Sequence, residues 1–320
     1  MNKYNNLNII IMSETKTFEE LFLSSNLSHN LSVSNLKILL ISDINSNYMY
    51  VEKLKEWQLE KNQYFDYVFF CGNFLNFNQE VNEQNNLPKA EADISGLITY
   101  IENIQLNVFY VPGYNDPKTL LKEEAPTITV KSKNIHKKFV KLADDLYVIG
   151  VSGNVAKMID NIPDGYFYIQ GNTIKKDNQS EYSLFSFNDK KFNNDLKETI
   201  DAFKKEISEN NSTPNIKFIL LTNIGPSHSP TTFLINEKEH NMCSSGSKRL
   251  QSDIADNSKE ILLNVHGGSP NNKGVSMIRD TVIVNPGELE KGNFAILEME
   301  RDAMDNYNWK IKNIELKELI

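Results

Sequence analysis

Five polar clusters in the sequence each follow a run of apolar residues, and their residue types could do chemistry together. They are Asp43-Ile-Asn45, Gly72-Asn73, Gly113-Tyr-Asn-Asp116, Thr222-Asn-Ile-Gly-Pro226 and Val265-His-Gly-Gly-Ser-Pro270. Carboxylate and amide oxygens and imidazole nitrogens are the donor types that hold divalent metal ions. Ligands of α/β proteins gather where the carboxyl ends of strands meet, so we expect these clusters to form the mouth of one site.

Alternating strand and helix patterns would position the clusters. Apolar runs predict buried strands at 37–42, 66–71, 107–111, 216–221 and 261–265. Helical spacing of apolar residues predicts amphipathic helices around Leu54, Ile98 and Phe203, and a shorter helix around Leu250 and Ile254. Additional strands are predicted at 138–142 and 146–151, and antiparallel strands at 275–277, 281–284, 294–299 and 309–316. The sequence therefore predicts one α/β domain over residues 37–320, preceded by a polar arm or tail of residues 1–36.

In order and spacing, the five clusters resemble the metal-binding loops of calcineurin-like metallophosphoesterases. Those loops read D-x-H, G-D, G-N-H-D/E, a lone His after a later strand, and G-H-x-H, and the resemblance covers residues 36–300. Asn285-Pro-Gly287 resembles the late N-P-G-S turn of the family. The resemblance implies a four-layer α/β/β/α sandwich with two mixed β-sheets. It also implies descent from a site in which two metal ions assist the hydrolysis of phosphate esters.

Most of the ligands of that family are replaced in this chain. Asp43 matches the first ligand, whereas Asn45 stands where the family has His and Asn73 where it has the bridging Asp. The other replacements are Tyr114 for the ligand Asn, Asn115 for the His that acts on the leaving group, Asn223 for the later His, and Gly268 and Pro270 for the two histidines of G-H-x-H. Asp43 alone keeps the identity that the family has at its position.

A pair of divalent ions needs anionic bridges and imidazole donors, and the matched positions offer one carboxylate. Losing even an outer ligand partner typically costs about 10–100-fold in metal affinity or activity. We therefore predict a vestigial site with no catalytic residue and no metal or cofactor, in which the asparagines form an amide cluster around Asp43. The alternative is a weak Mg²⁺ or Ca²⁺ held by Asp43 with amide oxygens of Asn45, Asn73 and Asn223.

Other reactive residue types have ordinary interpretations. His266 and His228 follow different strands, which disfavours a rebuilt metal site and predicts that His266 is a packed strand-end residue. Gly225-Pro-Ser-His-Ser229 places serine beside histidine without the G-x-S-x-G turn of a nucleophile. Cys71 is predicted to be a buried free thiol, because no basic residue lies near it in the sequence.

Composition limits the partners. The 320 residues carry a formal charge of -8 with a pI near 5.3, which disfavours nucleic acid. No run reaches transmembrane length, so no membrane partner is predicted, and the apolar stretch 9–12 is too short for a signal peptide. Cys71 and Cys243 cannot form a disulfide scaffold, which favours a reducing compartment, the cytoplasm. Whether the chain starts at Met1 or Met12, and its oligomeric state, stay open.

The sequence thus predicts a catalytically inactive phosphoesterase-like protein that serves as a structural or interaction subunit of a larger protein assembly. Expected contact regions are 1–36, 155–190 and 301–320, the last two for Tyr166-Phe-Tyr-Ile169 and Trp309. Their plain alternatives are a disordered tail, a local lid and an edge strand packed on the core. Two other functions stay open: a diverged metal-dependent phosphoesterase with an altered site, and a nucleotide or phosphate sensor that does not hydrolyse. A cytoskeletal or ciliary assembly is compatible with the sequence, although no residue argues for it.

Overall fold

The computed structural model describes most of the predicted domain. The described ranges are 34–75, 83–105, 107–113, 115–121, 131–152, 167–170, 173–176, 181–182, 189–209, 215–236, 241–244, 246–269, 271–302 and 308–320. The predicted arm up to residue 33, and Tyr114 and Pro270 of the candidate site, lie outside these ranges. Within them, no helix has the length and apolarity needed to cross a membrane.

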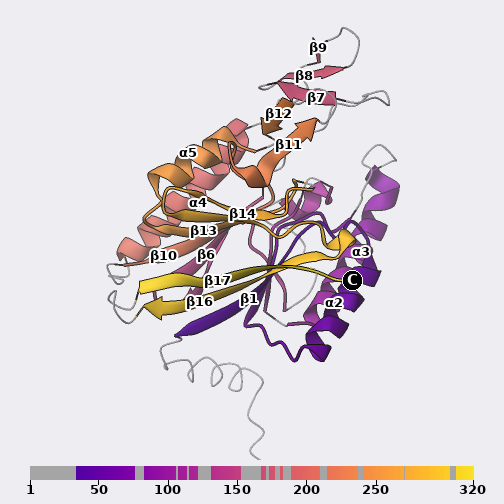
Figure 1. Ribbon diagram of the computed structural model, residues 1–320, viewed down its shortest axis with the longest axis horizontal. Helices are drawn as coiled ribbons and strands as arrows, with labels where there is room; N and C mark the ends of the chain where they lie inside the picture. The colour runs from indigo at the N-terminus through magenta and orange to yellow at the C-terminus, as the bar shows by residue number, and fades with distance from the viewer. Residues whose placement is uncertain are drawn as a thin grey trace, which may run out of the picture. The chain divides into compact units, whose positions relative to one another are not determined.

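The first sheet has six strands in the order β17-β16-β1-β2-β3-β4. Figure 1 labels β17, β16 and β1 of this sheet. Its parallel part is β1 (Asn35–Ile41), β2 (Tyr67–Phe70), β3 (Val108–Tyr110) and β4 (Lys133–Asn134). On the other side of β1, β16 (Asn293–Asp302) runs antiparallel to β1, and β17 (Asn308–Glu318) runs antiparallel to β16. The first strand begins at Asn35 rather than at the predicted Lys37. The parallel part turns the carboxyl ends of β1, β2 and β3 to one edge.

The second sheet has six strands in the order β14-β15-β13-β10-β6-β5. They are β5 (Lys138–Ala143), β6 (Leu146–Val151), β10 (Lys217–Thr222), β13 (Ile261–His266), β14 (Gly274–Ile278) and β15 (Thr281–Asn285). The four strands β6, β10, β13 and β15 are parallel, while β5 and β14 are antiparallel to their neighbours. The expectation that the C-terminal strands are all antiparallel is therefore wrong for β15. The hairpin of β14 and β15 reverses the chain once more, so β15 runs in the same direction as β13.

Helices cover the outer face of each sheet, which confirms the predicted α/β/β/α sandwich with two mixed sheets. The helices α2 (Tyr48–Glu60) and α3 (Glu83–Glu102) share a core with the first sheet. The helices α4 (Asp189–Glu209) and α5 (Lys248–Asp256) share a core with the second sheet. The predicted helical periodicity is confirmed where side chains are described. The residues of the predicted apolar face of α3 are buried, as is one residue beyond its end: Ile94, Leu97, Ile98, Ile101 and Ile104.

Strand residues alternate between two apolar layers. Leu39 and Ile41 belong to the core under α2 and α3, whereas Ile38 and Leu40 are fully buried on the opposite face, toward the second sheet. Because both faces are buried, the strands appear in the sequence as continuous apolar runs instead of alternating ones. Pattern alone therefore located these strands well.

Two smaller sheets were not predicted. One pairs β11 (Phe233–Asn236) with β12 (Asn241–Ser244), and the other joins β7 (Phe167–Gln170), β8 (Thr173–Lys176) and β9 (Glu181–Tyr182). The second of these lies within the predicted contact region 155–190, most of which lies outside the described residues. Their strands are short and flanked by polar residues, so they give little periodic signal.

A largely buried ion pair, with side chains 12% and 14% exposed, ties the two sheets together. Asp145, in the turn between β5 and β6, accepts two hydrogen bonds from the Arg301 guanidinium of β16, at 2.7 and 2.5 Å. The indole Nε1 of Trp309 donates to the same carboxylate at 2.9 Å, and the guanidinium carbon of Arg301 lies 4.8 Å from the Trp309 ring centroid. Trp309 is 2% exposed, so it packs in the core and is not the exposed aromatic expected from the sequence.

We expect Asp145→Ala to lower the free energy of unfolding by about 2–4 kcal/mol, because it leaves Arg301 and the Trp309 indole without their buried acceptor. Urea unfolding followed by circular dichroism measures this loss. The neighbouring Asp144→Ala is the matched control, since the Asp144 side chain is 82% exposed in its pair with Lys141 and should cost less than about 1 kcal/mol. Equal losses of unfolding free energy in the two variants would contradict a stabilising role of the Asp145–Arg301–Trp309 contacts.

Candidate functional site

The carboxyl ends of the parallel strands bring most of the predicted site residues together. Asp43, Asn73 and Asn115 follow β1, β2 and β3 of the first sheet, and Asn223 and Gly268 follow β10 and β13 of the second. Two hydrogen bonds join these loops across the sandwich. Asn223 Nδ2 donates to Cys71 O at 2.7 Å, and Gly268 N donates to Asp43 Oδ2 at 3.1 Å.

The carboxylate of Asp43 is at the centre of this site and accepts hydrogen bonds at both oxygens. Asn73 Nδ2 donates to Oδ1 at 2.6 Å, and Oδ2 accepts from Gly268 N and from the Ser42 hydroxyl. Asp43 is 7% exposed. A Cβ at Gly267 would overlap Ser42 Oγ and approach Asp43 Oδ2 to 3.0 Å, so only glycine permits this close approach of the two loops.

Burial raises the pKa of Asp43 from its ordinary value of 3.8 to about 6. The hydrogen bonds from Asn73, Ser42 and Gly268 favour the ionised form and limit the rise, whereas the nearby Glu288 carboxylate adds to it. No imidazole or ammonium group of the described residues is among the causes of the shift. The site therefore holds its central carboxylate by neutral donors.

Asp116, to which the sequence analysis assigned no role, organises the loops after β2 and β3. Its Oδ2 accepts from the backbone N–H groups of Gly113 at 2.7 Å and Asn73 at 2.9 Å, and its Oδ1 accepts from Leu75 N at 3.2 Å. Burial raises the pKa of Asp116 from 3.8 to about 6, against these hydrogen bonds. Its place at the end of the cluster Gly113-Tyr-Asn-Asp116 was the only signal in the sequence. A carboxylate that binds backbone amides has no side-chain partner that a sequence motif could reveal.

Left-handed backbone explains part of the residue choice. Asp43, Asn45 and Asn73 have φ values of 53°, 49° and 63°, and Gly268 has a φ of 62°. Aspartate and asparagine tolerate this conformation better than other residues with a side chain. Asparagine can therefore replace the ligands while the sharp turns at the strand ends persist.

The asparagines do not contribute equally. Asn73 hydrogen-bonds Asp43 through its Nδ2 and accepts from Asn115 N at 3.1 Å through its Oδ1, as an amide cluster would require. Within the described residues, the buried side-chain oxygens of Asn45 and Asn223 accept no hydrogen bond. Asn45 is held by its backbone instead, since its N–H donates to Asn73 O at 3.1 Å.

His266 is buried at the end of β13, as the sequence indicated. Its Nε2 lies 2.8 Å from Thr231 Oγ1 and its Nδ1 lies 3.1 Å from Gly267 O. Thr231 Oγ1 is in turn 2.7 Å from Ser229 Oγ, so the imidazole ends a chain of buried hydroxyl groups. Burial lowers the pKa of His266 from 6.5 to about 4. Both ring nitrogens are thus engaged away from Asp43.

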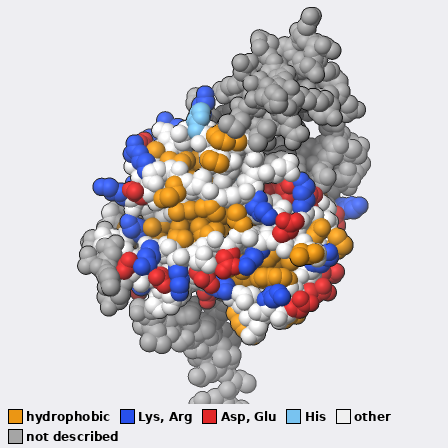
Figure 2. Space-filling view, in the orientation of Figure 1, with side chains coloured by type: hydrophobic (Ala, Val, Ile, Leu, Met, Phe, Trp, Pro, Cys, Tyr) orange, Lys and Arg blue, Asp and Glu red, His pale blue; other side chains and the backbone are white. Residues whose placement is uncertain are grey.

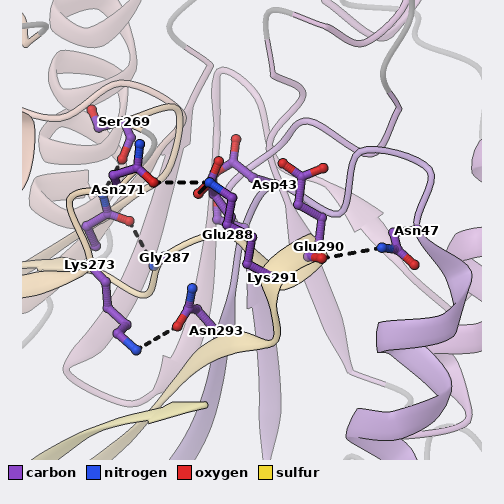
Figure 3. A network of polar contacts seen from close by, with 12 residues as sticks. Asp43, Asn47, Ser269, Asn271, Lys273, Gly287, Glu288, Glu290, Lys291 and Asn293 are labelled. Carbon is purple, nitrogen blue, oxygen red and sulfur yellow. Dashed lines mark hydrogen bonds and ion pairs between the residues drawn. The ribbon is translucent and has the colours of Figure 1, made fainter. Parts of the chain in front are cut away.

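A charged pair lies beside Asp43 and was missed from the sequence (Figure 3). Glu288 is 7% exposed and lies 2.5 Å from Lys291 Nζ, which also donates to Asn271 Oδ1 at 3.1 Å. The short helical turn Leu289–Lys291 is fixed to the site through Glu290 N, which donates to Asp43 O at 3.1 Å. In the sequence, the only indication of this pair was the position of Glu288 directly after Asn285-Pro-Gly287.

The residues present do not fit the metal pair that the fold implies. Both oxygens of Asp43 already accept protein hydrogen bonds, and Asn73, at the bridging position, turns its Nδ2 donor toward Asp43. Gly268 contributes only its backbone N–H. Among the described residues, no three His, Cys, Asp or Glu side chains are grouped so that they could hold an ion. A two-metal centre needs bridging anions and several lone pairs directed at one place.

Comparisons with known proteins identify the fold. No protein-family model and no curated protein sequence matches the chain. One solved crystal structure matches with a TM-score of 0.59 and 19% identity over 89% of this chain and 100% of that one. The protein TT1561 of Thermus thermophilus matches with a TM-score of 0.53 and 17% identity over 89% of this chain and 99% of that one. A dimetal phosphatase from Danio rerio has a TM-score of 0.47 and 8% identity over 89% and 99% of the respective chains.

At such identities the similarity concerns the fold. Together with the two six-stranded sheets and their strand order, it confirms the four-layer α/β/β/α fold with two mixed sheets expected from the sequence. The fate of the chemistry is a separate matter, because one fold can host both active and inactive sites.

We expect Asp43→Asn to change how stability depends on pH. With a folded pKa of about 6 against 3.8, Asp43 binds its proton more tightly in the native state, so its contribution falls as pH rises from about 4 to 6. The free energy of unfolding at pH 7 minus that at pH 4 should therefore be about 2 kcal/mol more positive in Asp43→Asn than in the unmodified protein. Urea unfolding at the two pH values measures it, with the exposed Asp144→Asn as control. If the difference between the two pH values is the same in both proteins, the pKa of Asp43 is not raised in the folded state.

His266→Gln should act in the opposite direction. A folded pKa of about 4 against 6.5 means that the neutral imidazole stabilises the native state, and this contribution is lost as pH falls from about 6.5 to 4. The same pH 7 minus pH 4 difference should become about 3 kcal/mol less positive in His266→Gln. His228→Gln, at an exposed position of the loop after β10, controls for the removal of a histidine. A difference that moves upward would refute the assignment.

Proposed function

We propose that this chain is a phosphoesterase-fold protein that does not hydrolyse phosphate esters and acts as an interaction or structural subunit in a protein assembly. The observation that carries the proposal is the state of the Asp43 carboxylate, whose two oxygens are used by Asn73, Ser42 and Gly268. A divalent ion would have to displace these donors. At the positions that match the family's metal ligands, Asp43 is the only anionic residue.

Hydrogen bonds take over the structural part of the role that metal ions have in such folds. Asp43 joins loops after β1, β2 and β13, and Asp116 joins loops after β2 and β3. Buried carboxylates whose oxygens all accept hydrogen bonds can hold neighbouring loops in one arrangement without an ion. The architecture can therefore persist when the reaction is gone, which leaves the outer surface as the functional part.

A protein partner suits the surface better than nucleic acid, because the formal charge is -8. The proposed contact regions remain 1–36, 155–190 and 301–320. Because Trp309 is buried, the contact surface proposed in the last region is the outward side of β17 and not the Trp309 ring. A reducing, cytoplasmic location is part of the proposal and is supported by Cys71, which is a buried free thiol.

A single weakly held hard cation is the second candidate, and one observation favours it. The buried side-chain oxygens of Asn45 and Asn223 accept no hydrogen bond within the described residues, and neutral oxygens of this kind are ligands of Mg²⁺ or Ca²⁺. This would correspond to a diverged phosphoesterase with a reduced site. A phosphate sensor has less support, because Lys291 beside the site is already paired with Glu288.

We expect no metal-dependent turnover of bis(p-nitrophenyl) phosphate or p-nitrophenyl phosphate with Mn²⁺, Ni²⁺ or Mg²⁺. The residual rate should equal that of Asp43→Ala, because removing a carboxylate that binds no metal removes no catalysis. Elemental analysis of the purified protein should find far less than one divalent ion per chain. Turnover that requires a metal and disappears in Asp43→Ala would establish the hydrolase instead.

The interaction role is tested by co-purification of the tagged full-length chain from its native cell extract. Deleting residues 1–33 removes no described strand, since β1 begins at Asn35. If the arm is a contact region, this deletion should remove at least one partner that the full chain retains, while the circular dichroism spectrum keeps its folded form. An unchanged set of partners would remove the arm from the proposal.

A further inference from the structure

The open edge of the first sheet is unusually long. β17 is the last strand in the sheet order, with β16 on one side and, among the described residues, no strand on the other. It has 11 residues, Asn308–Glu318, and none of them is proline. Such an edge offers a row of backbone N–H and C=O groups to another strand, and natural proteins usually shield it with lysines, proline or a bulge.

The first half of β17 carries such shielding. The register with β16 shifts between Glu298 and Met299, which marks a bulge in this half. Lys310 lies on the same half and pairs with Glu300 and Asp302 of β16, and Lys312 also pairs with Glu300. A bulge twists the edge, and charged side chains disfavour a new neighbour. The half that begins at Asn313 has neither a bulge nor a proline.

The second half of β17 turns a regular set of backbone groups outward. Leu319 N donates to Gly292 O at 2.9 Å, and the register continues with Glu318 opposite Asn293 and Leu316 opposite Ala295. Hydrogen-bonded and non-hydrogen-bonded pairs alternate along an antiparallel ladder. Because residue 319 is in a hydrogen-bonded pair, Ile314, Leu316 and Glu318 are in non-hydrogen-bonded pairs, with their N–H and C=O groups directed to the open edge.

Exposed apolar side chains accompany this edge. Leu316 is 37% exposed, and on β14, the edge strand of the second sheet, Val275 and Met277 are 44% and 64% exposed. Leu316 pairs with Ala295, and Val275 with Val284, so these side chains lie on the faces that the two sheets turn toward each other. Figure 2 shows hydrophobic side chains gathered on the face that carries β14 and β17. Apolar surface in one continuous area marks interaction sites.

We propose that the second half of β17 is a self-association surface, on which a second copy of this chain pairs antiparallel about a two-fold axis at Leu316. Two first sheets would then join into one continuous sheet, with an isologous interface. Leu316 would exchange backbone hydrogen bonds with Leu316 of the second copy, and Ile314 with Glu318 of the second copy. The proposal concerns backbone groups of a sheet edge, which the loops of Asp43 do not contain, and stands whether or not the chain hydrolyses phosphate esters.

Charge selects this register among the possible ones. A two-fold axis at Leu316 places Glu315 opposite Lys317 of the second copy, and does so twice. An axis at Glu318 would bring two Glu318 carboxylates together, and an axis at Ile314 would bring the bulged half into the interface. Opposite charges directly across an antiparallel pair are favourable and like charges are unfavourable. Within one copy, Glu315 and Lys317 form an ion pair along the strand, which places both side chains on the same face of this edge.

Sedimentation velocity of the full chain over a concentration series tests the proposal. We expect a species of twice 36.7 kDa to appear at concentrations up to about 100 µM. Lys317→Glu should weaken dimerisation at least about tenfold, because it places two pairs of like charges across the interface. Glu315→Lys combined with Lys317→Glu should restore it, which a merely structural role of either residue would not predict.

Leu316→Pro is a backbone test. The N–H of residue 316 is directed away from β16, so proline there removes a hydrogen bond of the dimer and none of the β16 ladder. The variant should be a monomer with an unchanged circular dichroism spectrum, while Lys310→Gln, in the shielded half, should dimerise like the unmodified chain. If Leu316→Pro does not fold, the charge series decides. A monomer throughout the concentration series, or a dimer insensitive to Lys317→Glu, would overturn the proposal.

Discussion

The structure of the strand-end loops depends on one buried carboxylate. Asp43 accepts from Asn73 on the neighbouring strand end, from Gly268 in the opposite sheet and from its neighbour Ser42, and it does so at 7% exposure. Burial of an unpaired anion is costly, which is why the pKa of Asp43 rises to about 6. The loops must therefore surround it closely with donors, and the glycine at 267 makes that approach possible. The arrangement of the loops at the strand ends follows from the need to provide hydrogen-bond donors to the Asp43 carboxylate.

Most of the fold could be predicted from the sequence, because its strands are buried on both faces and its helices are strongly periodic. The apolar runs before Asp43, Asn73 and Asn223 are β1, β2 and β10, within one or two residues at each end. What could not be predicted was direction and pairing. The parallel course of β15 depends on the hairpin with β14, and the short strands β7–β9, β11 and β12 carry no clear period.

The sequence located the candidate site but did not identify all of its residues. Motif order placed Asp43, Asn73, Asn223 and Gly268 at one edge, because the family's loops follow strands in a fixed order. Asp116 and Glu288 were not recognised, since their partners are backbone amides or a lysine three positions away and neither leaves a side-chain motif. The expected amide cluster is likewise uneven. Asn73 joins Asp43, while Asn45 is held by its main chain, a distinction that only geometry reveals.

Gly268 stands where the family that the sequence resembles has a histidine ligand, and its surroundings leave no room for a side chain. It has a left-handed φ of 62°, and a Cβ there would lie 2.7 Å from the carbonyl oxygen of Asn223. An imidazole restored at this position would meet both the strain of that conformation and a collision with the main chain of the next loop. A single codon change would thus not place a metal ligand here, because the course of the backbone excludes a side chain. A metal centre built at this position would need a different course of the loop after β13.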